Sequence, residues 1–345
     1  MDAYYAIAYQ APCHAVNRCP DAASARAQMR ETLDDLSTKI AASKRFIGPD
    51  VKLVVLPEYF LSGFPMGDRP EQWIAKAALE PDGPEYAALG NIAADNDLYL
   101  SGNAYETDSH FPGLYFQTSF VIDPTGCVIL RYRRLNSMFA PTPHDVWDRY
   151  IEIYGLEGVF PVADTPIGRL ACIASEEILY PEIARCLAMR GAEIFCHATS
   201  EVASAQETPK QIARRARALE NMAYVVSANS AGIDGSGFPA ASTDGNSAIV
   251  ASKGNILAEC NTGESMAAHA EIDIAALRRQ RRRPGMMNLL SRQRFAAFAD
   301  SYTAAEFQPA NALLDAAGNV KPLDRGYFAE AQQTVIRSLS ERGII

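Results

Sequence analysis

At residues 168–182 the chain reads GRLACIASEEILYPE. The apolar run at 170–174 predicts a buried strand, and the proline at 181 followed by amphipathic spacing predicts a helix over 181–190. Ser175 then lies on the turn between strand and helix, where nearby backbone N–H groups can hold an oxyanion. A serine at such a place is also typical of a helix cap, so this stretch alone leaves both readings open.

Alternating strands and helices continue on both sides of this stretch. Downstream, the patterns predict strands at 193–197, 223–229 and 268–272, a helix at 209–221, and a hairpin of 247–251 with 256–259. Upstream, they predict strands at 4–9, 51–56 and 98–103, a helix over 21–43, and a hairpin of 115–122 with 128–132. Two similar halves of this kind predict an α/β fold in which two mixed sheets are packed between outer helices, a four-layer α-β-β-α sandwich.

From about residue 278 the pattern becomes irregular, with prolines at 284, 309 and 322, before a last helix near 328–342. We therefore expect one domain over 1–277 and a C-terminal extension over 278–345. Such an extension is more easily explained by packing on the domain or on a neighbouring subunit than by completing the core.

Composition indicates which kinds of partner and which cellular compartment to expect. The net charge of −9 disfavours a nucleic-acid surface, and the basic run at 278–283 is interpreted as a solvated or subunit-contacting helix end. No apolar run is long enough for a membrane span and no signal peptide is visible, so no membrane partner is expected. The seven cysteines are scattered, without CxxC pairs or clustering with histidine. They predict reduced thiols in a cytoplasmic protein with no metal and no cofactor.

Two further positions carry candidate chemistry. Glu58 directly follows a buried strand in LPEYFLSGFP, residues 56–65, where partial desolvation can raise a carboxylate toward a useful general base. Phe60 and Phe64 of the same stretch are candidate pocket residues. Arg134 ends a strand in RYRRLN, residues 131–136. Each also has a plainer interpretation, a capping carboxylate for Glu58 and a solvated strand end for Arg134.

Together these segments resemble the nitrilase superfamily of carbon–nitrogen hydrolases. In that family a glutamate follows a strand in a Pro-Glu segment, a lysine follows a hairpin, and a cysteine lies six residues before a Pro-Glu pair. Glu58 matches the first motif, Arg134 stands at the lysine position, and Ser175 stands at the cysteine position because Pro181 and Glu182 follow it. The segments at 185, 191–193, 217–221, 229–232 and 245–247 agree as well, so the resemblance covers about residues 4–273.

The resemblance implies a catalytic set of Glu58, Arg134 and Ser175, a small-molecule amide or nitrile as substrate, and a homo-oligomer of two or more copies. In the family a thiolate attacks the substrate carbon, the glutamate takes its proton and the lysine stabilises the oxyanion. A serine hydroxyl is harder to deprotonate and normally has a histidine or lysine base beside it. Arginine keeps the positive charge but cannot shuttle a proton.

Three further residues are candidates for the roles that the substitutions leave open, and one cysteine is not. His197 ends the strand next to that of Ser175, so it is either a replacement base or a buried structural histidine. His144 and Asp145 lie near the place where the family often carries a second glutamate. Cys172 is assigned to the core, because its odd spacing from Ser175 places the two side chains on opposite faces.

Three functional hypotheses remain open from the sequence. The protein is a carbon–nitrogen hydrolase acting through an acyl-enzyme, impaired by its substitutions or carrying an engineered replacement of the cysteine. Alternatively, it is a serine-dependent enzyme of changed reaction type. The third hypothesis is a catalytically inactive homologue that binds a small molecule or a partner.

Overall fold

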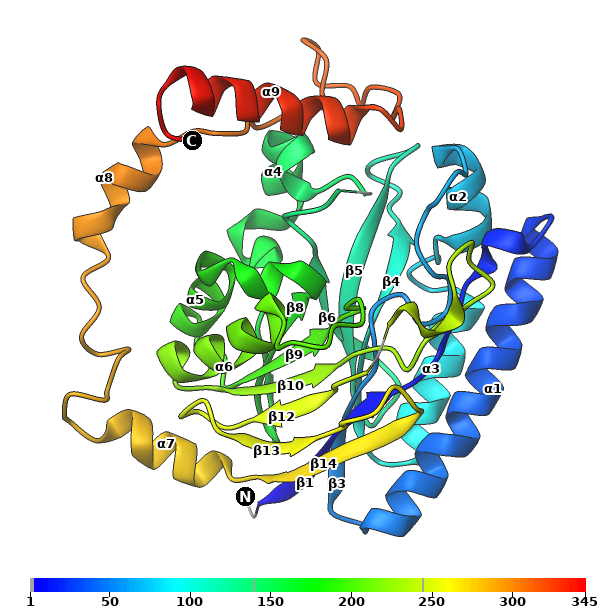
Figure 1. Ribbon diagram of the computed structural model, residues 1–345, viewed down its shortest axis with the longest axis vertical. Helices are drawn as coiled ribbons and strands as arrows, with labels where there is room; N and C mark the ends of the chain where they lie inside the picture. Colours follow the sequence, from blue (N-terminus) through cyan, green and yellow to red (C-terminus); the bar gives the residue numbers. More distant parts are fainter. Residues whose placement is uncertain (1–2, 139, 244) are drawn as a thin grey trace.

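The computed structural model describes residues 3–138, 140–243 and 245–345 and places two six-stranded mixed sheets face to face (Figure 1). The first sheet has the order β14 (Met266–Ile272), β1 (Tyr4–Gln10), β3 (Val51–Val55), β4 (Tyr99–Thr107), β5 (Tyr115–Ile122) and β6 (Val128–Arg133). The second has the order β13 (Ile256–Glu259), β12 (Ala248–Val250), β10 (Tyr224–Ala228), β9 (Ile194–Ala198), β8 (Gly168–Ala174) and β7 (Ala163–Thr165). This arrangement confirms the expected pair of mixed sheets.

Parallel pairing fills the middle of each sheet. Strands β1, β3 and β4 are parallel neighbours, as are β8, β9 and β10, whereas the outer pairs are antiparallel. Because parallel strands end at a common edge, the residues that follow β3, β8 and β9 come together at one side of the molecule. A short parallel pair, β2 (Cys13–His14) with β11 (Ile233–Asp234), lies outside the two large sheets.

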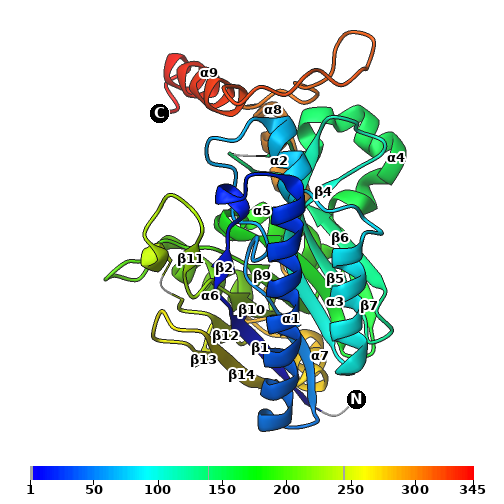
Figure 2. The ribbon, with the colours of Figure 1, turned by 90° about the vertical axis from the view of Figure 1, so that its right-hand side faces the viewer.

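Helices form the outer layers. Helices α1 (Ala22–Ile47), α2 (Pro70–Ala77) and α3 (Pro84–Asp95) lie on the first-sheet side, and α5 (Pro181–Met189) and α6 (Pro209–Asn221) lie on the second-sheet side (Figure 2). The buried face of α1, the helix expected over 21–43, carries apolar residues four or three apart, Ala25, Met29, Leu33, Leu36 and Ile40. The sequence patterns did not predict α2, α3 or α4 (Trp147–Val159).

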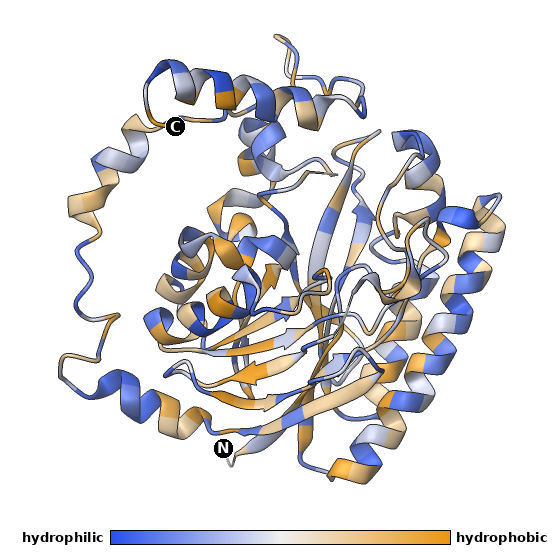
Figure 3. Cartoon of the chain, viewed as in Figure 1, coloured by the Kyte–Doolittle hydropathy of each residue, from blue (hydrophilic) through white to orange (hydrophobic). Residues whose placement is uncertain are grey.

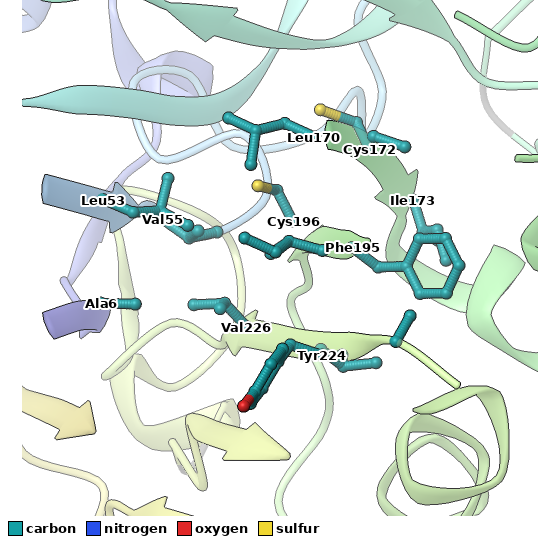
Figure 4. Close-up of a cluster of buried hydrophobic side chains, with 14 of the residues drawn as sticks. Ala6, Leu53, Val55, Leu170, Cys172, Ile173, Phe195, Cys196, Tyr224 and Val226 are labelled. Carbon is teal, nitrogen blue, oxygen red and sulfur yellow. The ribbon is translucent and has the colours of Figure 1, made fainter. Parts of the chain in front are cut away.

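The space between the sheets is filled by small and branched apolar side chains. Leu53 and Val55 from β3 face Leu170, Cys172 and Val226 from the second sheet (Figure 4). Burial raises the pKa of the Cys172 thiol well above its ordinary value. Cys172 is therefore a core residue, as predicted. Figure 3 shows the same hydrophobic concentration on the strands of the second sheet.

Strand β4 corrects one boundary. It was expected over 98–103, but it continues to Thr107, paired with β5 as far as Tyr115. The last residues of β4 include polar ones, which is why the apolar pattern ended too early. Glu106 among them is buried and ion-paired with Arg131 and Arg133 of β6. Buried charges of this kind occur in a sheet when a partner is present.

After α7 (Ile274–Arg282) the chain leaves the body, and the boundary expected at 277/278 falls within this helix. Figure 1 shows α8 (Ala296–Ala304) on an outlying arm of the chain and α9 (Tyr327–Glu341) beyond the α4 end of the body. The arm touches the body where the Tyr302 hydroxyl of α8 donates to Glu182 of α5 at 2.8 Å. The basic end of α7 is partly held by the body, since Arg278 pairs with Glu193 and Arg281 donates to the Met222 carbonyl at 2.9 Å. In the part of the chain that the structure describes, no helix is long and apolar enough to cross a membrane.

Candidate active site

Ser175 directly follows β8 and begins a short 3-10 helix, η3 (Ser175–Leu179). It is 2% exposed, and its φ of 49° lies in the left-handed region that few residues other than glycine adopt. Its backbone carbonyl, by contrast, faces His197. At this turn the Ser175 carbonyl and the Ser175 hydroxyl therefore have different partners.

Glu58 lies at the neighbouring edge, three residues after β3, and is buried. Its Oε1 accepts hydrogen bonds from Gln117 Nε2 at 2.6 Å and from Arg134 Nη1 at 3.0 Å. Its Oε2 is buried and has no partner among the described residues. The Glu58 backbone N–H donates to the Thr199 carbonyl at 3.2 Å, which joins the edges of the two sheets.

Arg134 follows β6 and its side chain is almost fully engaged. Besides Glu58, Nη1 donates to Gln117 Oε1 at 2.5 Å, Nε donates to the Asn136 carbonyl at 2.6 Å, and Nη2 is ion-paired with the Glu176 carboxylate. A guanidinium has five N–H groups, and four of them are used here. Arg134 is therefore a fixed cation between two carboxylates, which leaves it little capacity to bind an oxyanion.

Glu177 supports the segment after Arg134. The buried carboxylate accepts from the backbone N–H groups of Leu135 and Asn136 at 2.7 and 3.0 Å, and from the Tyr132 hydroxyl at 2.8 Å. Burial raises the pKa of Glu177 to about 7, although Arg134 opposes the shift. This carboxyl therefore changes its charge near neutral pH while it holds the Arg134 segment in place.

Lys210, the second residue of α6, belongs to this site although the sequence motifs did not predict it. Its Nζ donates to Ser175 Oγ at 3.0 Å and to Thr199 Oγ1 at 3.2 Å. The residue keeps some solvent exposure, yet burial around the amine is the main cause that lowers its pKa. Arg134 also lowers the pKa of Lys210, whereas Glu58 and Glu201 raise it. The available signal was positional: the helix predicted at 209–221 follows the strand at 193–197, so its first residues approach the edge where Ser175 lies.

His197 and Asp145 were candidates for the roles left open by the substitutions, and each has other partners in the structure. His197 Nε2 lies 2.9 Å from the Ser175 carbonyl and Nδ1 lies 2.8 Å from Ser227 Oγ, so the ring holds the two strands and does not contact the Ser175 hydroxyl. Burial lowers the pKa of His197 to about 3. Asp145 accepts from Thr142 and from the Tyr327 hydroxyl of the extension. The described contacts of the Asp145 carboxylate therefore anchor α9. Among the described residues, Arg134 is paired with Glu58 and Glu176 and not with Asp145.

The structure thus brings Glu58 and Arg134 into direct contact, and it links Ser175 to them through Lys210 and Thr199. Phe60, a candidate pocket residue, is instead fully buried in the core under the first sheet. The Phe64 ring lies 5.7 Å from the Tyr59 ring and 6.1 Å from the Phe238 ring. Within the described ranges, no group of histidine, cysteine and acidic residues could hold a metal ion.

Comparison with known proteins adds a family match. The model of the family described as carbon-nitrogen hydrolase matches residues 9–282. Formamidases of Bacillus thuringiensis (strain Al Hakam) and Bacillus cereus (strain AH820) are each 29% identical over 189 residues, which are 54% of this chain and 52% of the formamidase. The chain therefore spans about half the length of the curated relatives it matches.

Solved structures share the fold at lower identity. A carbon-nitrogen hydrolase from Helicobacter pylori G27 superposes with a TM-score of 0.65 at 20% identity, covering 87% of this chain and 98% of that one. A branch 10 member of the nitrilase superfamily from Saccharomyces cerevisiae has the same TM-score and identity over 81% and 93%. A double mutant of the amidase from Nesterenkonia sp. AN1, in complex with acrylamide, has a TM-score of 0.61 at 18% identity over 87% and 97%.

Proposed function

The chain belongs to the carbon–nitrogen hydrolase family, within the nitrilase superfamily, and on that premise we propose that it hydrolyses the C–N bond of a small amide through an ester on Ser175. The observation that carries the proposal is the unpartnered Oε2 of Glu58, buried at the sheet edge that Ser175 also occupies. A buried carboxylate oxygen without a donor costs free energy until a donor arrives. An amide N–H₂ group, or the water that later cleaves the ester, supplies such a donor.

The proposed roles follow from the contacts. Ser175 Oγ attacks the amide carbon, and Glu58 Oε2 orients the amide nitrogen and then the water. Arg134 and Gln117 hold the other oxygen of Glu58 and keep its carboxylate in place. The names of the relatives, formamidases and an amidase bound to acrylamide, support a short, uncharged amide as the substrate class; a small nitrile belongs to the same test.

The experiment is a turnover assay with a chemical trap. Ammonia release is measured for formamide, acetamide, propionamide, acrylamide and acetonitrile, and acidified reactions are analysed by intact mass for one acyl group on the chain. We expect release with at least one amide and its loss in Ser175→Ala. Ser252→Ala is the matched control, because Ser252 is also buried but lies in the turn between β12 and β13, where its hydroxyl bonds to Gln280 of α7. Absence of both turnover and adduct across the panel would refute the proposal.

A second candidate is a binding protein without turnover. It is favoured by the near-saturated guanidinium of Arg134 and by the 2% exposure of Ser175, which describe a closed site. Under this hypothesis an amide raises the Tm of the wild-type protein and of Ser175→Ala alike, while neither releases ammonia.

We also propose that the protein is a cytoplasmic homo-oligomer in which the exposed face of α8, within the extension 278–345, docks on a neighbouring subunit while α9 stays anchored to its own body. All seven cysteines are free thiols, which is typical of a reducing compartment. On α8, Phe298 and Tyr302 are 51% and 62% exposed, so this helix presents aromatic surface although the Tyr302 hydroxyl donates to Glu182 of α5.

A further inference from the structure

A lysine amine lies within hydrogen-bond distance of the proposed nucleophile, Ser175, and this lysine belongs to none of the family motifs described above. The expected cysteine and lysine are both replaced, yet a lysine from another element reaches Ser175 Oγ at 3.0 Å. Thr199 Oγ1, 3.2 Å from the same Nζ, takes a second N–H of the amine. When the amine is protonated it donates to both oxygens; when it is neutral, its lone pair can accept from the Ser175 hydroxyl while an N–H still donates to Thr199, so the two partners orient the amine.

The surroundings of Lys210 favour its neutral form. Lys210 is the second residue of α6, and the positive end of a helix dipole disfavours a cation there. Burial and Arg134 act in the same direction, while the carboxylates of Glu58 and Glu201 act in the opposite one. A guanidinium stays charged in proteins, and Glu58 and Glu176 hold that of Arg134 in place, so its positive charge is a fixed part of the site.

We propose that Lys210 is the general base that activates Ser175, an inference that rests on the serine ester chemistry proposed above. The geometry points to it because Lys210 Nζ is 3.0 Å from Ser175 Oγ, whereas Glu58 makes no hydrogen bond to Ser175 among the described residues and His197 contacts the carbonyl. The free Oε2 of Glu58 is assigned above to the amide nitrogen and the water. Thr199 is a positioning residue that acts through the amine. Serine nucleophiles with a lysine base are chemically competent when the lysine is neutral.

The proton follows a closed cycle. In neutral Lys210 the Ser175 hydroxyl donates to the Nζ lone pair; as Oγ bonds to the amide carbon, the proton moves to Nζ and the carbonyl electrons become an oxyanion. Collapse breaks the C–N bond, and Nζ returns the proton to the leaving nitrogen, which departs as ammonia. Water then attacks the ester, Nζ takes its proton, the C–Oγ bond breaks and Oγ recovers a proton. The sum is amide plus water giving acid plus ammonia.

The test uses an alkyl fluorophosphonate, which forms a phosphorus–oxygen bond with an activated serine as fluoride leaves. Labelling of Ser175 is followed by intact mass and peptide mapping from pH 6 to 11 in the wild type, Lys210→Met and Lys210→Arg. Lys210→Arg keeps the positive charge but cannot accept a proton, so it separates a base from a mere cation. Lys44→Met is the control, because burial also lowers the pKa of Lys44 but the residue lies near the end of α1.

We expect both Lys210 variants to label about 100-fold more slowly or worse, as for removal of a general base. The wild-type rate is expected to rise with pH through one ionisation below the ordinary lysine value of about 10.4, and this rise is lost in the variants. Because Glu177 titrates near 7 in the same site, the profile is repeated in Glu177→Gln, which is expected to keep the lysine limb. A wild-type rate that does not rise with pH overturns the inference even if a variant fails to fold.

A second nucleophile separates catalysis from structure. In a Ser175→Cys background the thiol ionises near ~8.5 without a strong base, so Lys210→Arg is expected to slow alkylation by iodoacetamide less than tenfold. Equal losses in the serine and cysteine backgrounds, or full labelling of either Lys210 variant with serine present, would show that Lys210 is not the base while leaving the Ser175 ester intact. A wild type that neither labels at Ser175 nor turns over any amide overturns the proposed function, and this inference with it.

Discussion

Replacing Glu177 with glutamine is expected to remove a pH dependence from the free energy of unfolding. Burial raises the pKa of this carboxyl from 4.5 to about 7, so the folded protein keeps a proton that the unfolded chain has released. The stability that depends on this proton is complete below pH 4.5 and is lost as the pH rises to about 7. Since one pKa unit corresponds to about 1.4 kcal/mol, a shift from 4.5 to about 7 limits the loss to at most about 3.5 kcal/mol.

Urea unfolding followed by circular dichroism at pH 4.5, 5.5, 6.5 and 7.5 measures this loss. Glutamine can still accept from the backbone N–H groups of Leu135 and Asn136, so Glu177→Gln isolates the titration from the hydrogen bonds. Glu193→Gln is the control of opposite sign, because the ion pair with Arg278 helps to lower the pKa of Glu193 against its burial and its contribution is lost as the pH falls. Parallel stability curves for wild type and Glu177→Gln between pH 4.5 and 7.5 would refute the reasoning.

Three further outcomes are expected. Arg134→Lys removes guanidinium contacts with Gln117 and Glu176 that a single ammonium cannot make together. It should lower the free energy of unfolding by about 1–3 kcal/mol, measured as a lower urea midpoint. Tyr327→Phe removes the donor to buried Asp145 and should cost about 1–2 kcal/mol; an unchanged midpoint would deny that this contact anchors α9. Truncation after residue 283 should shift the light-scattering mass of an oligomer toward the monomer, whereas a monomeric full-length chain would contradict the assembly proposal.

Much of the fold could be predicted from local patterns. Continuous apolar runs such as 170–174 identified the central strands, because parallel strands in the middle of a sheet are buried on both faces. Strand β4 shows where this fails: Glu106 reads as a surface residue until its partners, Arg131 and Arg133, are placed beside it by β6. Long-range pairing of this kind has no local signature.

In the candidate site, too, some residues could be predicted from local sequence and others could not. Glu58, Arg134 and Ser175 came from motifs at fixed spacing, but the hydrogen bonds that determine their chemistry come from other elements. Lys210 is 35 residues from Ser175 and belongs to no motif that was considered. A lysine at the start of an amphipathic helix is ordinarily a solvated residue, so only the position of α6 against β8 and β9 identifies it.

The left-handed backbone of Ser175 bears on how this site has fared over evolutionary time. Left-handed conformation costs a residue with a Cβ about 1–2 kcal/mol, and glycine would relieve that strain. A site released from selection can drift to such a stabilising substitution without penalty. A hydroxyl in contact with a buried amine, at a strained position where glycine would be more stable, is what continued use of the residue would maintain.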